Sequence, residues 1–205
     1  MTEKRLDGKF NLKTWSLLFF TVSLIGWAFE TLICYFQSGD ITDRGFLTLP
    51  FCPIYGFPVC VIYFLLGTPT DGLFFHLLGG GKGNEKSDQG RRAVAVVLYY
   101  LSSALFATAV ELIVGVSLNK VGLPLWSYGD TPLTFMKVIS LPVSIAWGGM
   151  ITVFAQVCIP PLMRLFTKLP EGKKQFLTSL LWTATLADFL ANGVYFLLTG
   201  NHFIG

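Results

Sequence analysis

The chain has 205 residues, of which 53% are hydrophobic, 15% aromatic and only 13% charged, and its mean hydropathy is +0.61. These values lie outside the usual range of soluble domains and indicate an integral membrane protein whose main partner is the lipid bilayer. The formal net charge of +3 comes without a basic stripe interleaved with aromatic residues, so nucleic acid is excluded as a partner.

Five apolar segments follow one another, at about residues 14–37, 50–67, 92–118, 138–163 and 175–199. Four of them are long enough to cross roughly 30 Å of hydrocarbon at about 1.5 Å per residue. We therefore predict an all-α fold, a polytopic membrane helix bundle of about five transmembrane helices in a single integral membrane domain over residues 1–205. The first segment is too long for the apolar part of a signal peptide and contains Glu30, so we expect it to stay in the membrane.

The second segment, residues 50–67, is shorter and overlaps the motif RGFLTLPFCPIYG at residues 44–56. It carries Pro53 and Pro58, and proline removes a helix hydrogen bond. Lipid tolerates freed backbone groups only where protein or water satisfies them. We predict a spanning helix with a proline-broken, partly re-entrant outer end.

Residues 68–91 are the candidate soluble excursion, which we predict to be a cytoplasmic loop. The stretch GGGKGNEKSDQG superficially resembles a Walker A loop, but Lys82 is followed by Gly83 instead of Ser or Thr and the glycine spacing is wrong. We reject a nucleotide site there. Residues 71–78, DGLFFHLL, are expected to form a short amphipathic segment at the membrane interface, with His76 near its wet edge.

The third and fourth segments repeat features of the first two. LPFCPIYG at 49–56 and LPVSIAWG at 141–148 share a Leu-Pro pair and an aromatic-Gly pair at the same spacing. Each follows a segment with one acid, Glu30 or Glu111. The halves would then be two parallel two-helix repeats followed by one helix, an arrangement in which some transporters place a site at the repeat interface. A chance match of two short motifs is the alternative.

Lysine and arginine are distributed unevenly between the two ends of the predicted bundle. Twelve of the fifteen lie in the N-terminal tail, the 68–91 loop and the loop before the last segment. The other three are Arg44, Lys120 and Lys137. The positive-inside rule then places the N-terminus in the cytoplasm and, with five spans, the C-terminus outside.

The four cysteines lie in or at the edges of the apolar segments. They are Cys34, Cys52, Cys60 and Cys158. Their spacing fits neither a zinc site nor a disulfide framework, so we interpret them as small buried hydrophobic residues. We predict no metal and no cofactor.

Several motifs together resemble one known family. They are GWAFE with Trp27 and Glu30, RGFL and PFCPIYG at 44–56, Glu111, LWSYGD with Trp126 and Tyr128, and SIAWG. Over about residues 20–160 the chain resembles the bacterial family of putative ABC-transporter type IV (CmpB-like) integral membrane permeases. The family pattern has an acid between the two aromatics of the LWSYGD motif and then a Gly-Arg pair, where this chain has Ser127 and Met136-Lys137.

The resemblance implies a transport role in the bacterial inner membrane. An ABC permease needs an ATPase, and the chain has no nucleotide-binding motif, so a separate ATPase subunit would dock on the basic cytoplasmic loops. A chain this small would also form a homodimer.

Three acids interrupt the apolar segments: Glu30, Glu111 and Asp188. Because an ionised carboxylate near the bilayer centre costs about 2.5–3.5 kcal/mol, we expect all three to face the protein interior and to be paired, hydrogen-bonded or protonated. If RGFLTLP lets the chain dip back from the outer surface, Arg44 would reach towards Glu30, and Lys137 would pair with Glu111 in the same way. Asp188 and Asn192 lie one turn apart and would complete a polar lining.

The remaining candidate binding residues come from the two repeated motifs and the LWSYGD motif. Tyr55 and Trp147 occupy equivalent places in the repeats and suit ligand stacking or cation–π contact. Trp126 and Tyr128 fit an interfacial aromatic belt as well as a site. Cys52 and Ser144, within the repeated motifs, complete the candidate set, and no catalytic residue is predicted.

Three functional hypotheses stay open at this point. The first is a small permease or transport-related subunit with an outward-side polar cavity lined by Glu30, Arg44 and Glu111. The second is an integral membrane enzyme acting on lipid or peptidyl substrates, with a carboxylate as base and Arg44 as anion clamp. The third is a non-catalytic partner that assembles or regulates another complex, in which the acids only fasten helices together.

Overall fold

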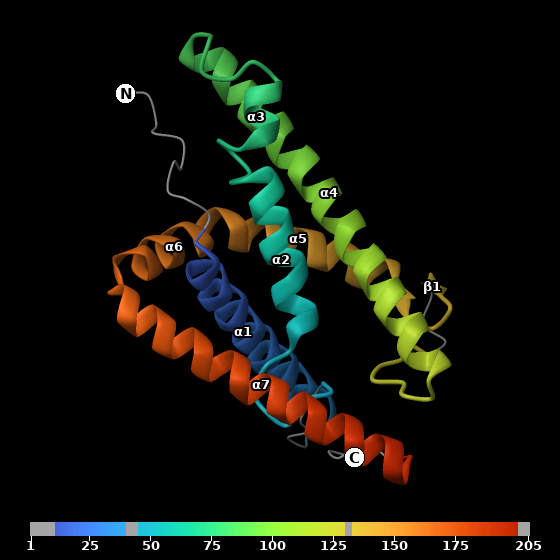
Figure 1. Ribbon diagram of the computed structural model, residues 1–205. Coiled ribbons are helices and arrows are strands. Elements are labelled where there is room, and N and C mark those ends of the chain that lie inside the picture. The colour runs from blue at the N-terminus through green and yellow to red at the C-terminus, as the bar shows by residue number, and fades with distance from the viewer. Residues whose placement is uncertain (1–10, 40–44, 130–132, 201–205) are drawn as a thin grey trace.

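The computed structural model describes residues 11–39, 45–129 and 133–200. This part of the chain folds into seven helices and one short hairpin (Figure 1). The helices are α1 (Leu12–Ser38), α2 (Pro53–Leu66), α3 (Leu73–Leu77), α4 (Glu85–Lys120), α5 (Leu141–Val157), α6 (Ile159–Lys168) and α7 (Glu171–Thr199). The hairpin pairs β1 (Thr134–Phe135) with β2 (Ile139–Ser140) in antiparallel register. The prediction of an all-α membrane helix bundle is confirmed.

Three helices, α1, α4 and α7, are each long and apolar enough to cross a membrane alone. The predicted span at 138–163 is corrected to two helices, α5 and α6, whose axes differ by 45°. Pro160 and Pro161 lack the N–H groups that would continue α5, so the chain starts a new helix just after Cys158. A fourth span exists only if this bent pair crosses as a unit.

The second predicted span is shorter than expected. α2 has 14 residues and is therefore about 21 Å long at about 1.5 Å per residue, less than the roughly 30 Å of a bilayer core. Its N-cap residue Cys52 donates its backbone N–H to the carbonyl of Ser23 at 3.1 Å, beside the middle of α1. Residues 45–52, which precede α2, are not helical. The chain thus lies beside the middle of α1 where α2 begins.

The loop before α4 is shorter than the predicted 68–91. The Asn84 side chain accepts a hydrogen bond from the backbone N–H of Ser87 and caps the helix, so α4 starts at Glu85. With 36 residues, α4 is about 54 Å long and exceeds the thickness of a bilayer core. Within the loop, α3 covers most of the predicted amphipathic segment, and His76 is exposed as expected.

The hydrophobic core lies where α1, α2, α4, α5 and α6 meet. Leu18, Tyr99, Ala155 and Ile159 are its most completely buried members. α7 lies along one side of the molecule (Figure 1), where Trp182 stacks on Phe19 of α1 with ring centroids 5.7 Å apart. The two predicted repeats correspond to the antiparallel pairs α1–α2 and α4–α5.

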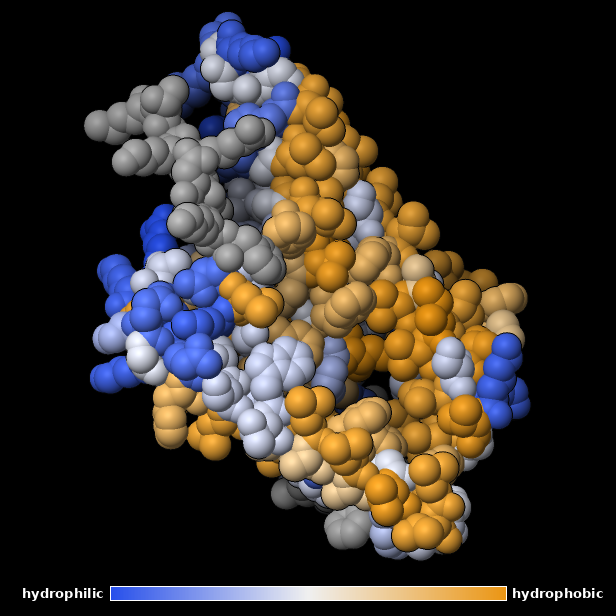
Figure 2. Space-filling model, in the orientation of Figure 1, coloured by the Kyte–Doolittle hydropathy of each residue, from blue (hydrophilic) through white to orange (hydrophobic). Residues whose placement is uncertain are grey.

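The surface separates polar ends from apolar walls. Figure 2 shows hydrophilic residues over the α3–α4 turn and around the turn between α6 and α7, with a hydrophobic band along α4. Exposed apolar side chains on α4 include Val97, Leu101, Leu105 and Ile113. Such a band suits contact with lipid acyl chains, because they are as apolar as these side chains.

Candidate functional site

Glu30 is held by a tyrosine from the neighbouring helix. Gly26 and Glu30 lie one turn apart on α1, and Tyr55 in the first turn of α2 packs against them. A Cβ at position 26 would lie 2.5 Å from Tyr55 Cδ2, so only glycine lets the ring approach α1 this closely. The Tyr55 hydroxyl donates a hydrogen bond to Glu30 Oε2.

Glu111 is held by a tyrosine from the loop that follows α4. The Tyr128 hydroxyl donates to Glu111 Oε1, while Oε2 is buried with no hydrogen-bond partner among the described residues. The Glu111 residue is only 9% exposed. Two contacts position the loop, since Trp126 Nε1 donates to the Val138 carbonyl at 3.1 Å and the Tyr128 N–H donates to the Lys137 carbonyl at 2.8 Å.

Trp147 on α5 joins the two acid–tyrosine pairs. Its ring centroid lies 4.8 Å from that of Tyr55, and its indole lies near enough to Tyr128 to affect the charge on that phenol. The Glu30 and Glu111 carboxyl groups interact electrostatically. We call Glu30, Tyr55, Trp147, Tyr128 and Glu111 the acid-aromatic cluster, which runs continuously from the α1–α2 pair to the α4–α5 pair.

Asp188 on α7 has a different set of partners. Its carboxylate accepts hydrogen bonds from the Thr48 hydroxyl, the Leu49 N–H at 3.1 Å and the Asn192 side-chain amide at 3.1 Å. None of these three groups belongs to the acid-aromatic cluster. Asp188 and Asn192 therefore fasten the segment before α2 to α7, and the predicted common lining with the other two acids is not formed by these contacts.

The remaining predicted residues have individual outcomes. Arg44 lies outside the described residues. Among those described, Glu111 makes no ion pair with Lys137, which contributes its backbone carbonyl to Tyr128 instead. Cys52 is buried and caps α2, and Ser144 is buried on α5.

The hairpin explains why Lys137 is held through its backbone. Met136 and Lys137 have φ angles of 52° and 60°, in the left-handed region that favours glycine. This tight turn directs the Lys137 carbonyl to the N–H of Tyr128.

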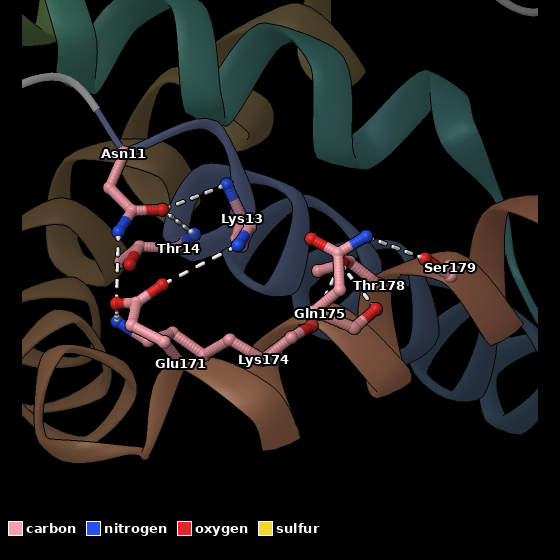
Figure 3. A network of polar contacts seen from close by, with 8 residues as sticks. All are labelled: Asn11, Lys13, Thr14, Glu171, Lys174, Gln175, Thr178 and Ser179. Atoms are coloured by element: carbon pink, nitrogen blue, oxygen red, sulfur yellow. Dashed lines mark hydrogen bonds and ion pairs between the residues drawn. The ribbon is translucent and has the colours of Figure 1, made fainter.

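One polar network escaped the sequence analysis. Lys174, at the start of α7, is only 3% exposed, and its Nζ lies 2.5 Å from Glu171 Oε1. Lys13 and Asn11 at the start of α1 also contact the Glu171 carboxylate (Figure 3). In the sequence, Lys13 and Lys174 count only towards the predicted charge bias, because the burial of Lys174 depends on how α7 packs against α1.

The described residues contain no group of three or more His, Cys, Asp or Glu side chains that would hold a metal ion. All four cysteines are free, and Cys34 and Cys52 are buried. The acid-aromatic cluster itself offers two carboxylates, two phenols and an indole. These groups bind protons or cations through carboxylate oxygens and aromatic faces.

Comparison with known proteins gives one match. A family model described as "Putative ABC-transporter type IV" matches residues 17–192, which include the whole acid-aromatic cluster. No curated protein and no solved structure matches the chain.

Proposed function

Because the chain belongs to the family described as putative ABC-transporter type IV, we propose that it is a small multi-pass membrane permease or transport subunit. In this proposal Glu30 and Glu111 form the binding site of an outward-side polar cavity. The bound species is a proton, a metal cation or the positively charged group of a solute. Trp126 and Lys137 belong to the surroundings of this site.

The observation that carries the proposal is the coupling of two carboxyl groups, Glu111 buried and Glu30 half-buried, through the acid-aromatic cluster. Each acid accepts a hydrogen bond from a tyrosine, and the two acids interact electrostatically. Two ionised carboxylates in apolar surroundings repel each other and lose hydration, so a shared proton or a cation lowers the free energy of the pair. A contact that only fastened helices would need neither the second acid nor the unpartnered Glu111 Oε2.

The partners and orientation follow from the family and from the charge distribution. We propose a separate ATPase subunit that docks on the basic cytoplasmic surface, because the sequence contains no nucleotide-binding motif. The N-terminus would be cytoplasmic and the C-terminus outside, and the functional unit would contain two copies of the chain.

The proposal is tested by co-purification of partner proteins and by measurement of cation uptake into vesicles. Tagged protein is purified from its native host in mild detergent, and mass spectrometry identifies what accompanies it. The purified assembly is then placed in lipid vesicles, and uptake of Na⁺, K⁺ and tetramethylammonium is measured for the native chain, Glu30→Gln and Glu111→Gln. The glutamine oxygen still accepts the tyrosine hydrogen bond, so the charge changes while the packing is kept.

The matched control is Glu85→Gln, which removes an exposed carboxylate in the first turn of α4, outside the cluster. We expect both cluster variants to lose cation flux at normal abundance while the control keeps it. A stoichiometric ATPase would support the ABC assignment. Equal flux in all variants would refute the proposed site, and reduced abundance with unchanged flux per molecule would favour a purely assembling role.

A further inference from the structure

The inner face of α4 carries a row of buried polar groups on the N-terminal side of Glu111. Tyr99 is 1% exposed and Ser103 is 0% exposed, and together with Glu111 they belong to the buried stripe of α4. The Tyr99 hydroxyl, the Ser103 hydroxyl and Glu111 Oε2 all lack a hydrogen-bond partner among the described residues. Buried polar groups normally have partners, so three unpartnered groups on one helix face need a physical explanation.

Helix α5 supplies a fourth such group in the interval between Ser103 and Glu111. A Cβ on Gly115 would meet Val138, and one on Gly148 would meet Ala104, so α5 runs antiparallel along α4. Ser144, which lies between positions 138 and 148, therefore faces α4 between Ala104 and Gly115. Its hydroxyl is also buried and unpartnered.

The row continues from Tyr99 towards the basic end of the molecule. Tyr63 on α2 packs against the core cluster that contains Tyr99, and the two phenols interact electrostatically. The positive charge of Arg164 on α6 is near enough to act on the Tyr63 phenol, and Arg164 is exposed. Arg164 belongs to the cation-rich loops that the positive-inside rule assigns to the cytoplasm.

We propose that Ser144, Ser103, Tyr99 and Tyr63 line a proton path that connects Glu111 with the cytoplasmic surface near Arg164. Tyr99 and Ser103 lie one helical turn apart on the same face of α4, and ordered water commonly joins buried polar groups that lack a protein partner. A hydroxyl both donates and accepts, so each group passes a proton on and returns to its starting form. The Glu111 carboxylate takes one proton from its neighbour, and one proton enters from the cytoplasm to replace it.

This inference rests on the proposed function and deepens it, since it names the proton as the ion exchanged at Glu111. The experiments can refute the binding site and the proton path independently. If Glu111→Gln abolishes cation flux while the hydroxyl variants leave proton flux unchanged, the binding site stands and the path is wrong.

The experiment measures proton entry into vesicles that contain the full chain and a trapped pH-sensitive dye, with a K⁺ diffusion potential as driving force. Tyr99→Phe removes one hydroxyl with almost no change of shape, and Ser103→Ala removes another. We expect each to slow proton flux at least about tenfold, which is less than the roughly 10²–10⁴-fold that a proton-transfer group typically contributes. Ser103→Thr, which restores a hydroxyl, should recover most of the flux.

The matched control is Thr185→Ala. Thr185 lies on α7, away from the row, and its hydroxyl is likewise buried and unpartnered. It should keep native flux. Native flux in Tyr99→Phe and Ser103→Ala, an equal loss in Thr185→Ala, or a native chain that carries no protons would each overturn the path.

Discussion

The contact between α4 and α5 positions Trp147 and Ser144, and it depends on one glycine. A Cβ on Gly148 would lie 2.7 Å from the Cβ and 3.2 Å from the Cα of Ala104, and 3.2 Å from Cε2 of Tyr100. Because Ala104 Cα belongs to the backbone of α4, the helices must separate to accept the methyl group. We therefore predict that Gly148→Ala destabilises the α4–α5 pair.

The neighbouring glycine provides the matched comparison. A Cβ on Gly149 would meet Tyr100 at 3.9 Å, which is ordinary van der Waals contact. Both substitutions gain the same helix propensity, up to about 1 kcal/mol. Overpacking typically costs about 1–3 kcal/mol, so Gly148→Ala should be less stable than Gly149→Ala by about that amount.

A double-mutant cycle isolates the contact. Ala104→Gly removes the methyl group that the new Cβ meets, so it should be destabilising alone by about 1 kcal/mol and should relieve much of the clash in the Gly148→Ala background. The free energy of unfolding is measured in mixed micelles with increasing SDS, followed by circular dichroism. Equal stability of the two alanine variants, or a coupling energy of zero, would refute the packing derived for Gly148.

Three further substitutions test other contacts. Met136→Gly should raise the free energy of unfolding by about 1 kcal/mol, because glycine adopts the left-handed φ at that position without strain, and an unchanged midpoint in SDS would contradict this. Tyr55→Phe should lower the free energy of unfolding by about 1–2 kcal/mol, since it removes the hydroxyl that donates to Glu30 inside the bundle. An unchanged unfolding midpoint in SDS would show that this hydrogen bond does not stabilise the protein. Asp188→Ala should increase amide hydrogen exchange over residues 45–49 at least about tenfold, because their anchor on α7 is lost, and native exchange rates would show that other contacts hold the segment.

The sequence predicted well the features that depend on composition and on local rules. Long apolar segments have few alternatives to helix in lipid, so three of the five predicted spans match single long helices. Pro53 marks the late start of α2, whereas the bend that Pro160 and Pro161 impose between α5 and α6 was not predicted. The burial cost of carboxylates also identified Glu30 and Glu111 as interior groups.

The partners of these acids could not be predicted in the same way. Opposite charge suggested Lys137 for Glu111, but the carboxylate accepts a hydrogen bond from Tyr128. The hairpin turn that holds Lys137 through its backbone depends on left-handed φ angles at residues with no strong preference for them. No periodicity or spacing in the sequence specifies such a turn.

The sequence by itself thus determined the class of the protein, its main helices and the need to compensate buried acids, because hydropathy and desolvation act on each segment independently. Only the tertiary structure decided that Trp147 stands between Tyr55 and Tyr128, that Asp188 fastens the segment before α2, and that unpartnered hydroxyls line α4 below Glu111. These relations join residues far apart in the chain. They depend on where helices pack closely, as at Gly26 and Gly148, and such distances follow from the whole packing of the bundle.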